Sequence, residues 1–216
     1  MSKHSVDLMI PFEVASIFFF ASVVIIFAPG PDNIFVLTKS ALHGRTAGLI
    51  ATLGICTGLM VHTAAVAFGV AAIFQTSALA FNFLKILGVL YLLYLAWQLF
   101  RTGEIRQSQN RKAGIAGIQL YTRGVLMNVT NPKVAIFFLA FLPQFVDPAR
   151  GSLIIQTLIL GALFIVVTFT VFGLIALSAG FMGTRLKSSK RAQDVLNRIV
   201  GTAFVGLAIK LATTDR

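Results

Sequence analysis

Long apolar stretches alternate with short polar ones along the 216 residues of this chain. A helix needs about 20 mostly apolar residues to cross a bilayer. Six stretches fit this length or approach it, at 11–28, 46–74, 78–100, 124–145, 152–182 and 199–213, and the last of them is short. The pattern therefore predicts an all-α polytopic membrane protein with six transmembrane helices and no soluble domain.

The second half of the chain repeats the first. The segment after Pro31 matches the segment after Pro132, because both continue into Ile-Phe. Glycines recur at the same ten-residue spacing, as Gly48 and Gly58 in the first half and as Gly151 and Gly161 in the second. An internal duplication explains this agreement.

Each repeat contains three spans, and an odd number of spans inserts the second copy upside down. We expect a single transmembrane transporter domain over residues 1–216. Repeat one covers 11–100, a cytoplasmic loop covers 101–120, and repeat two covers 121–216. Inverted repeats with broken hydrophobic segments at matching places are typical of secondary transporters.

Spans one and four contain the helix breaks. Proline removes a backbone donor and clashes with the preceding turn, and glycine adds backbone freedom. The residues predicted to break these helices are Pro29, Gly30 and Pro31 in span one and Pro132 in span four. Free backbone groups at membrane depth are tolerated only where protein buries them or where they line a wet cavity. Each break is therefore a candidate cavity wall.

Asp32 and Lys133 occupy equivalent positions at the two breaks. Acidic side chains are costly near the bilayer centre and are often functional there. We expect Asp32 to bind an ammonium group or a proton, and Lys133 to bind a carboxylate. The alternatives are that Asp32 caps a helix, that the two residues form a structural ion pair, and that Lys133 extends to the interface.

Other polar residues near the breaks are candidate partners in substrate binding or proton coupling. They are Asn33, Asn128, Thr130 and Asn131, whose side chains can also satisfy freed backbone groups. His62 lies inside span two and is a candidate proton relay, with hydrogen-bonded packing as the alternative. Tyr91, Tyr94 and Trp97 suggest an interfacial belt more than a substrate site.

Glycines at helical spacing predict close contact between helices. The candidate packing seams contain Gly48, Gly54, Gly58 and Gly161. Smooth seams of this kind permit helices to slide during transport, and they are compatible with a homodimer.

Composition and charge support the membrane interpretation. Apolar residues make up 57% of the chain and charged residues 12%. Most of the basic residues behind the net charge of +11 fall in the loops after spans one, three and five. Positive loops remain in the cytoplasm, so both termini are expected outside. This distribution favours lipid contact over nucleic-acid binding.

The sequence offers little for an enzyme. It contains a single cysteine, Cys56, and three scattered histidines. Ser-His-Asp order, a phosphate-binding loop and two-cysteine metal spacing are all missing from it. We expect no metal, no cofactor and no enzymatic activity.

The chain resembles the LysE/RhtB family of bacterial amino-acid exporters over nearly its whole length. The resemblance rests on Pro29-Gly30-Pro31-Asp32-Asn33, Gly44-Arg45-x-x-Gly48, Gly54-x-x-x-Gly58, Asn128-x-x-Asn131-Pro132-Lys133 and Phe141-Leu142-Pro143-Gln144-Phe145. It implies proton-driven export of amino acids across the inner membrane, and it makes a homodimer plausible.

The functional prediction is a secondary active exporter that works by proton antiport and alternating access. Neutral substrates such as threonine, homoserine or leucine are favoured over basic ones, because Asp32 is the only acid at membrane depth. A passive channel or facilitator for a small solute is the alternative. The sequence leaves open which amino acid is exported, which ion is coupled and whether the protein forms oligomers.

Overall fold

A computed structural model of the chain describes residues 9–76, 78–101, 116–182 and 190–213. Within these residues the protein is entirely helical, and no strand is present. The α-helices are α1 (Phe12–Phe27), α2 (Pro31–His43), α3 (Arg45–Thr76), α4 (Ala78–Arg101), α5 (Gly117–Val129), α6 (Pro132–Ile136), α7 (Leu153–Met182) and α8 (Lys190–Thr213). A π-helical turn, η1 (Phe137–Phe141), and two 3₁₀ turns, η2 (Leu142–Phe145) and η3 (Pro148–Arg150), follow α6.

The first helix break lies between α1 and α2. Gly30 is fully extended, with φ −170° and ψ 177°, and Pro31 begins α2, where its missing N–H is not needed. The helix axis bends by 62° between α1 and α2. The break therefore falls at the Pro-Gly-Pro segment, as the sequence predicts.

The second break lies between α5 and α6. The side chain of Asn131 caps α6 by accepting a hydrogen bond of 3.0 Å from the backbone N–H of Lys133. Pro132 follows the cap at the first position of the helix. The axis bends by 49° between α5 and the segment that starts at Pro132. Capping and proline thus restart the helix in a new direction.

Two helices, α3 and α7, contain stretches long and apolar enough to cross a membrane, at Arg45–Gly69 and Leu153–Ser178. Each bent pair of helices also passes this test when it is taken as one span, which raises the number to four. The apolar stretches described in α4 and α8 are shorter, at Lys85–Gln98 and Asn197–Ile209. The described residues thus contain between two and four candidate spans.

Two helices begin earlier than the apolar pattern predicts. α5 starts at Gly117, so residues 117–120 of the expected cytoplasmic loop are helical, and residues 102–115 lie outside the described part. α8 starts at Lys190, so residues 190–198, which precede the expected span at 199–213, are also helical. α8 opens with a polar, charged turn, and α5 opens with alternating apolar and polar residues. Neither start is a continuous apolar run, and this explains the errors.

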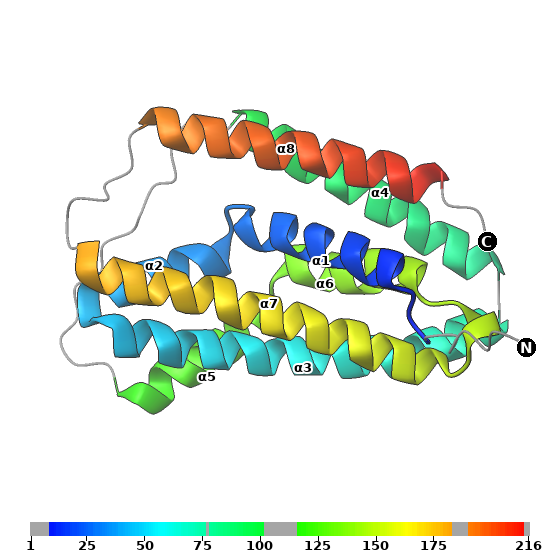
Figure 1. The fold of residues 1–216 in the computed structure, drawn as a ribbon, viewed down its shortest axis with the longest axis horizontal. Coiled ribbons are helices and arrows are strands. Elements are labelled where there is room, and N and C mark those ends of the chain that lie inside the picture. Colours follow the sequence, from blue (N-terminus) through cyan, green and yellow to red (C-terminus); the bar gives the residue numbers. More distant parts are fainter. Residues whose placement is uncertain (1–8, 77, 102–115, 183–189, 214–216) are drawn as a thin grey trace, which may run out of the picture.

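The long helices run side by side along the long axis of the molecule (Figure 1). α3 packs against α7 and α5, while α4 packs against α8. α2 fills the space between α3 and α7, and α1 lies against α7. α1 and α6 therefore lie in the interior, between the α3–α7 pair and the α4–α8 pair, whereas α5 lies on the outer side of α3 (Figure 1).

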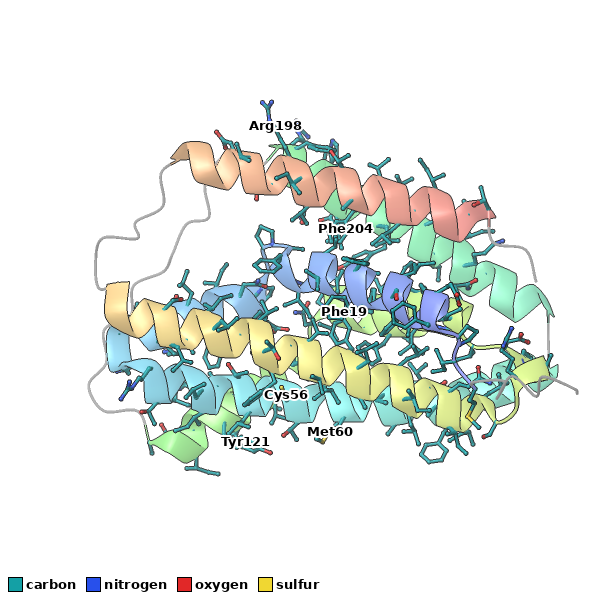
Figure 2. The ribbon with its side chains drawn as sticks, viewed as in Figure 1. Phe19, Cys56, Met60, Tyr121, Arg198 and Phe204 are labelled. Atoms are coloured by element: carbon teal, nitrogen blue, oxygen red, sulfur yellow. The ribbon has the colours of Figure 1, made fainter. Side chains whose placement is uncertain are left out.

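Apolar side chains fill the core of the bundle and also cover much of its outer surface (Figure 2). Phe204 is fully buried on the inner side of α8, whereas Phe20, Phe68 and Leu174 are largely exposed. An aqueous surface rarely carries so much exposed apolar area. This surface suits contact with lipid.

Candidate functional site

The two helix breaks are joined by a buried hydrogen bond. Asp32 lies in the first turn of α2, and Asn128 lies in the last turn of α5. The Asn128 side chain donates from Nδ2 to Oδ2 of Asp32 across 2.9 Å. Asp32 is 3% exposed and Asn128 is fully buried. The carboxylate of the first half is thus held by an amide of the second half.

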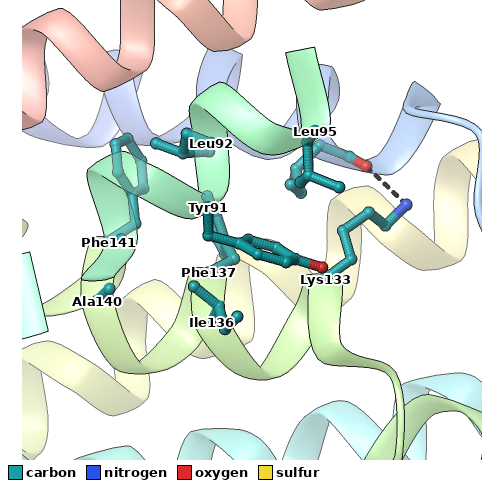
Figure 3. Close-up of a pocket in the computed structure, with 10 residues that line it drawn as sticks. Tyr91, Leu92, Leu95, Lys133, Ile136, Phe137, Ala140 and Phe141 are labelled. Carbon is teal, nitrogen blue, oxygen red and sulfur yellow. Dashed lines mark hydrogen bonds between the residues drawn. The ribbon is translucent and has the colours of Figure 1, made fainter. Parts of the chain in front are cut away.

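Lys133 makes the reverse connection. From the first turn of α6, its Nζ donates to the backbone oxygen of Ala28 at 2.8 Å. It also donates to the backbone oxygen of Ile25 at 3.1 Å, the bond drawn as a dashed line in Figure 3. These carbonyls form the C-terminal end of α1, where the helix dipole favours a cation. The lysine of the second half therefore caps a helix of the first.

Asn33 completes the closure of the first break. Its Nδ2 donates to the backbone oxygen of Ile26 across 2.6 Å, and its Oδ1 lies 3.5 Å from Nζ of Lys133. Three carbonyls at the end of α1 thus receive side-chain donors. Such satisfaction is what irregular backbone needs where water is excluded.

Asp32 and Lys133 do not form an ion pair, although both are buried and described. Lys133 is only 6% exposed, and its ammonium points into the protein, toward α1. The alternatives of a structural ion pair and of a lysine extended to the interface do not fit these contacts. Each charge is stabilised separately by groups of the opposite half.

Several polar atoms of this cluster lack a hydrogen-bond partner. They are Oδ1 of Asp32, Oδ1 of Asn128 and Nδ2 of Asn131. Buried polar atoms are nearly always paired, so each exception needs an explanation. Two acceptors and one donor left over at the junction of two helix breaks can bind a proton, an ammonium group or a carboxylate. We define Asp32, Asn33, Asn128, Asn131 and Lys133 as the central cluster.

His62 contacts the central cluster through the backbone of Asn128. Its Nε2 lies 3.2 Å from the backbone oxygen of Asn128, and its ring lies 5.7 Å from that of Phe138. Thr130 lies outside the cluster. It is exposed, and its hydroxyl donates to the backbone oxygen of Leu126 across 2.8 Å. The structure thus groups the expected polar residues except Thr130.

Two glycines create space for the central cluster. A Cβ atom on Gly30 would lie 3.0 Å from Nζ of Lys133, and one on Gly58 would lie 2.6 Å from Oδ1 of Asn128. The other expected seam glycines pack against neighbouring elements. Gly48 faces Ser40 and Ala176, Gly54 faces the backbone of Tyr121, and Gly161 faces Thr63.

A small cavity of about 10 Å³ borders Lys133 (Figure 3). Its walls include Tyr91, Leu95 and Phe141. A space of that size holds about one water molecule, so the central cluster is closed to an amino acid in this conformation. Tyr91 was expected in an interfacial belt more than at a substrate site, and its place beside Lys133 has no signal in the sequence. Tyr94 and Trp97 are exposed.

The described residues contain no group of His, Cys, Asp or Glu side chains arranged to hold a metal ion. Cys56 is buried and free. The chemistry available at the central cluster is therefore that of one carboxylate, one ammonium and several amides.

Comparison with known proteins is consistent with these features. The model of the family described as LysE type translocator matches residues 23–215. The chain is 30% identical over 190 residues to a leucine efflux protein of Enterobacter sp. (strain 638), which covers 88% of this chain and 90% of that protein. It is 31% identical over 193 residues to a leucine efflux protein of Klebsiella pneumoniae, which covers 89% and 91%. No solved structure matches the chain.

Proposed function

Because the chain belongs to the family of LysE type translocators, we propose that it is a secondary active exporter of neutral amino acids, with leucine as the first substrate to test. Both relatives described above are named as leucine efflux proteins. The observation that carries the proposal is the central cluster, in which a buried carboxylate and a buried ammonium lie at two helix breaks.

The proposed membrane arrangement has six spans in two inverted repeats, located in the bacterial inner membrane. Span one is α1 with α2, and span four is α5 with α6, η1 and η2. The distribution of basic residues favours termini on the outer side. Packing of α3 on α7, and of α4 on α8, pairs elements that the repeat makes equivalent, which supports this arrangement.

In the proposed mechanism, the substrate replaces the contacts between the halves. Lys133 leaves the carbonyls of Ile25 and Ala28 and binds the substrate carboxylate, while Asp32 binds the substrate ammonium. Binding of a proton at Asp32 competes with this ammonium. Alternation of the two occupants, one on each side of the membrane, gives proton antiport.

A neutral side chain fits this cluster better than a basic one. The sequence places no acid other than Asp32 at membrane depth, and the α-ammonium group of the substrate already requires that carboxylate. The second charge of a basic substrate would be left unpaired in a low-dielectric site, at high cost. Leucine and other neutral amino acids avoid this cost.

Efflux from cells preloaded with labelled amino acids tests the proposal. We expect wild type to export leucine, a protonophore to abolish export, and Asp32→Asn to do the same while the protein remains in the membrane. The matched control is Asp194→Asn, which changes an acid in α8, outside the central cluster. Leucine efflux that survives the protonophore would support a passive facilitator instead. Unchanged efflux in Asp32→Asn would refute the role of the carboxylate.

A further inference from the structure

A second cavity, of about 350 Å³, lies at the N-terminal end of α1. It is bounded by Val14 and Ile17 of α1, by Phe141 and Phe145 of η1 and η2, and by the loop that contains Asp147 and Arg150. Ligand pockets typically measure about 300–1,000 Å³, so the cavity can admit an amino acid. It is distinct from the small cavity beside Lys133.

One residue forms a wall of both cavities. Phe141 lines the space beside Lys133 as well as the larger cavity. It is 2% exposed, and its ring packs against Phe137 at 5.0 Å and Phe145 at 4.9 Å. Aromatic packing thus separates the central cluster from the larger cavity, and a shift of these rings would connect them.

Polar groups at the larger cavity match the two charged ends of an amino acid. The Arg150 guanidinium has five donors, and its Nε contacts Oδ2 of Asp147 at 3.4 Å. Gln144 donates from Nε2 to the backbone oxygen of Ala140 at 3.4 Å, and its buried Oε1 has no partner. Guanidinium groups suit carboxylates, and a free amide oxygen suits an ammonium group.

The loop that contains Arg150 is held in place by a residue of α7. Gln156 of α7 is 1% exposed, and its side chain accepts from the N–H of Asp147 at 2.9 Å and donates to the oxygen of the same residue at 2.9 Å. Oδ1 of Asp147 in turn accepts from the N–H of Ala149 at 2.9 Å. The charged rim is therefore preorganised, and preorganised groups lose less entropy on binding.

We propose that this cavity is a second binding site for an α-amino acid with an apolar side chain, occupied on the outer side of the membrane after release from the central cluster. Arg150 binds the carboxylate, Oε1 of Gln144 binds the ammonium, and Val14, Ile17 and Phe145 contact the side chain. The proposal rests on the exporter function, because release from the central cluster to this side is a step of export.

Thiol labelling of intact cells tests the site. Val14→Cys, made in a Cys56→Ala background, places a thiol in the apolar wall without altering a proposed polar ligand. A membrane-impermeant thiol reagent should label this variant from outside. Lys39→Cys lies on the side predicted to be cytoplasmic and should be labelled only in permeabilised cells.

Ligand protection then identifies what the cavity binds. External leucine should slow labelling of Val14→Cys several-fold, whereas 4-methylpentanoate, which lacks the ammonium group, and 3-methylbutylamine, which lacks the carboxylate, should not. Adding Arg150→Gln should abolish protection, while the matched control Arg123→Gln should retain it. Labelling without protection by leucine, or labelling only after permeabilisation, would overturn the proposal.

The same cells separate this proposal from the exporter function. Efflux of preloaded leucine is measured for the wild type and for the Val14→Cys variant. Export without protection refutes the outer site and leaves the exporter proposal intact. Failure of wild type to export any amino acid refutes the exporter proposal, and the outer site then fails with it as a stage of export, even if leucine binds the cavity.

Discussion

At the residue scale, the buried charged side chains are hydrogen-bonded to groups from distant parts of the sequence. Asp32 accepts from Asn128, and Lys133 donates to Ile25 and Ala28. Removing one partner of a buried charged group leaves the other desolvated and unpaired, which is more costly than losing an exposed contact. Single substitutions at this cluster should therefore have large effects.

Asn128→Leu is the first such substitution. It removes the donor to Asp32 and should lower the free energy of unfolding by about 1–3 kcal/mol, because a buried acceptor loses its hydrogen bond. Thermal unfolding of the protein in detergent measures the effect. Thr130→Ala, two residues away and exposed, is the control and should change little. Equal melting temperatures for the two variants would contradict the prediction.

Gly30→Ala tests the position of Lys133. Its φ of −170° is open to any residue, so backbone strain plays no part, but the new Cβ would lie 3.0 Å from Nζ. We expect reduced leucine export, because the ammonium must shift away from its position between the halves. Gly69→Ala, where a Cβ meets nothing within 4 Å, should export normally. Loss of export in both variants would point to a general effect of replacing glycine.

At the scale of elements, packing depends on how closely the backbones of neighbouring helices approach each other. α3 and α5 meet where Gly54 and Gly124 face each other, and a Cβ on Gly124 would lie 2.6 Å from the backbone oxygen of Ala51. In lipid, small residues at such contacts replace the hydrophobic driving force that operates in water. The position of Asn128, at the end of α5, depends on this contact.

Gly54→Ala should separate these helices. The added methyl group meets the carbonyl of Tyr121, which belongs to the backbone and cannot rotate away. Overpacking typically costs about 1–3 kcal/mol, so the melting temperature in detergent should fall. Gly206→Ala in α8 meets nothing within 4 Å and serves as the control. A stable Gly54→Ala protein would show that α5 can move without loss.

The irregular segment that follows α6 is a second feature at the scale of elements. Pro143 cannot donate a backbone hydrogen bond, and the chain before it widens into the π-helical turn η1 and then tightens into η2. π-Helical turns are frequent at functional sites. Here the turn presents Phe141 to both cavities.

The contacts between the two halves determine how the whole molecule holds together. Hydrogen bonds link α1 and α2 to α5 and α6 in both directions, and α3 packs against α7. The halves should therefore associate even without a covalent link.

Co-expression of residues 1–110 and 111–216 as separate chains tests this association. We expect the two chains to co-purify and to restore part of leucine export, while either chain expressed without the other exports nothing. Lys133→Met in the second chain should weaken co-purification, because the end of α1 loses its donor. Failure of the wild-type pair to associate would show that the covalent connection is essential.

Apolar patterning predicts much of the helical structure. The expected spans at 46–74, 78–100 and 152–182 agree closely with α3, α4 and α7, and the proline and glycine residues locate both breaks. The starts of α5 and α8 could not be predicted this way, because the first turn of α8 is polar and that of α5 mixes apolar with polar residues.

Candidate site residues can also be chosen from the sequence, but the groups that contact them cannot. Polar residues at the breaks identify Asp32, Asn128 and Lys133 as candidates. The contact between Lys133 and Ile25 joins positions 108 residues apart, and local patterning carries no information about such distances. The same is true of Tyr91 and Gln144, whose roles depend on the packing of neighbouring helices.

The capping of α1 by Lys133 has a consequence for biosynthesis. When α1 enters the membrane, the lysine that will satisfy Ile25 and Ala28 has not yet been translated. Until it arrives, these carbonyls need water, lipid headgroups or the insertion machinery as temporary partners. The first half should therefore remain incompletely folded until residue 133 has been translated. Ribosome stalling before that residue should leave a nascent chain that is prone to degradation.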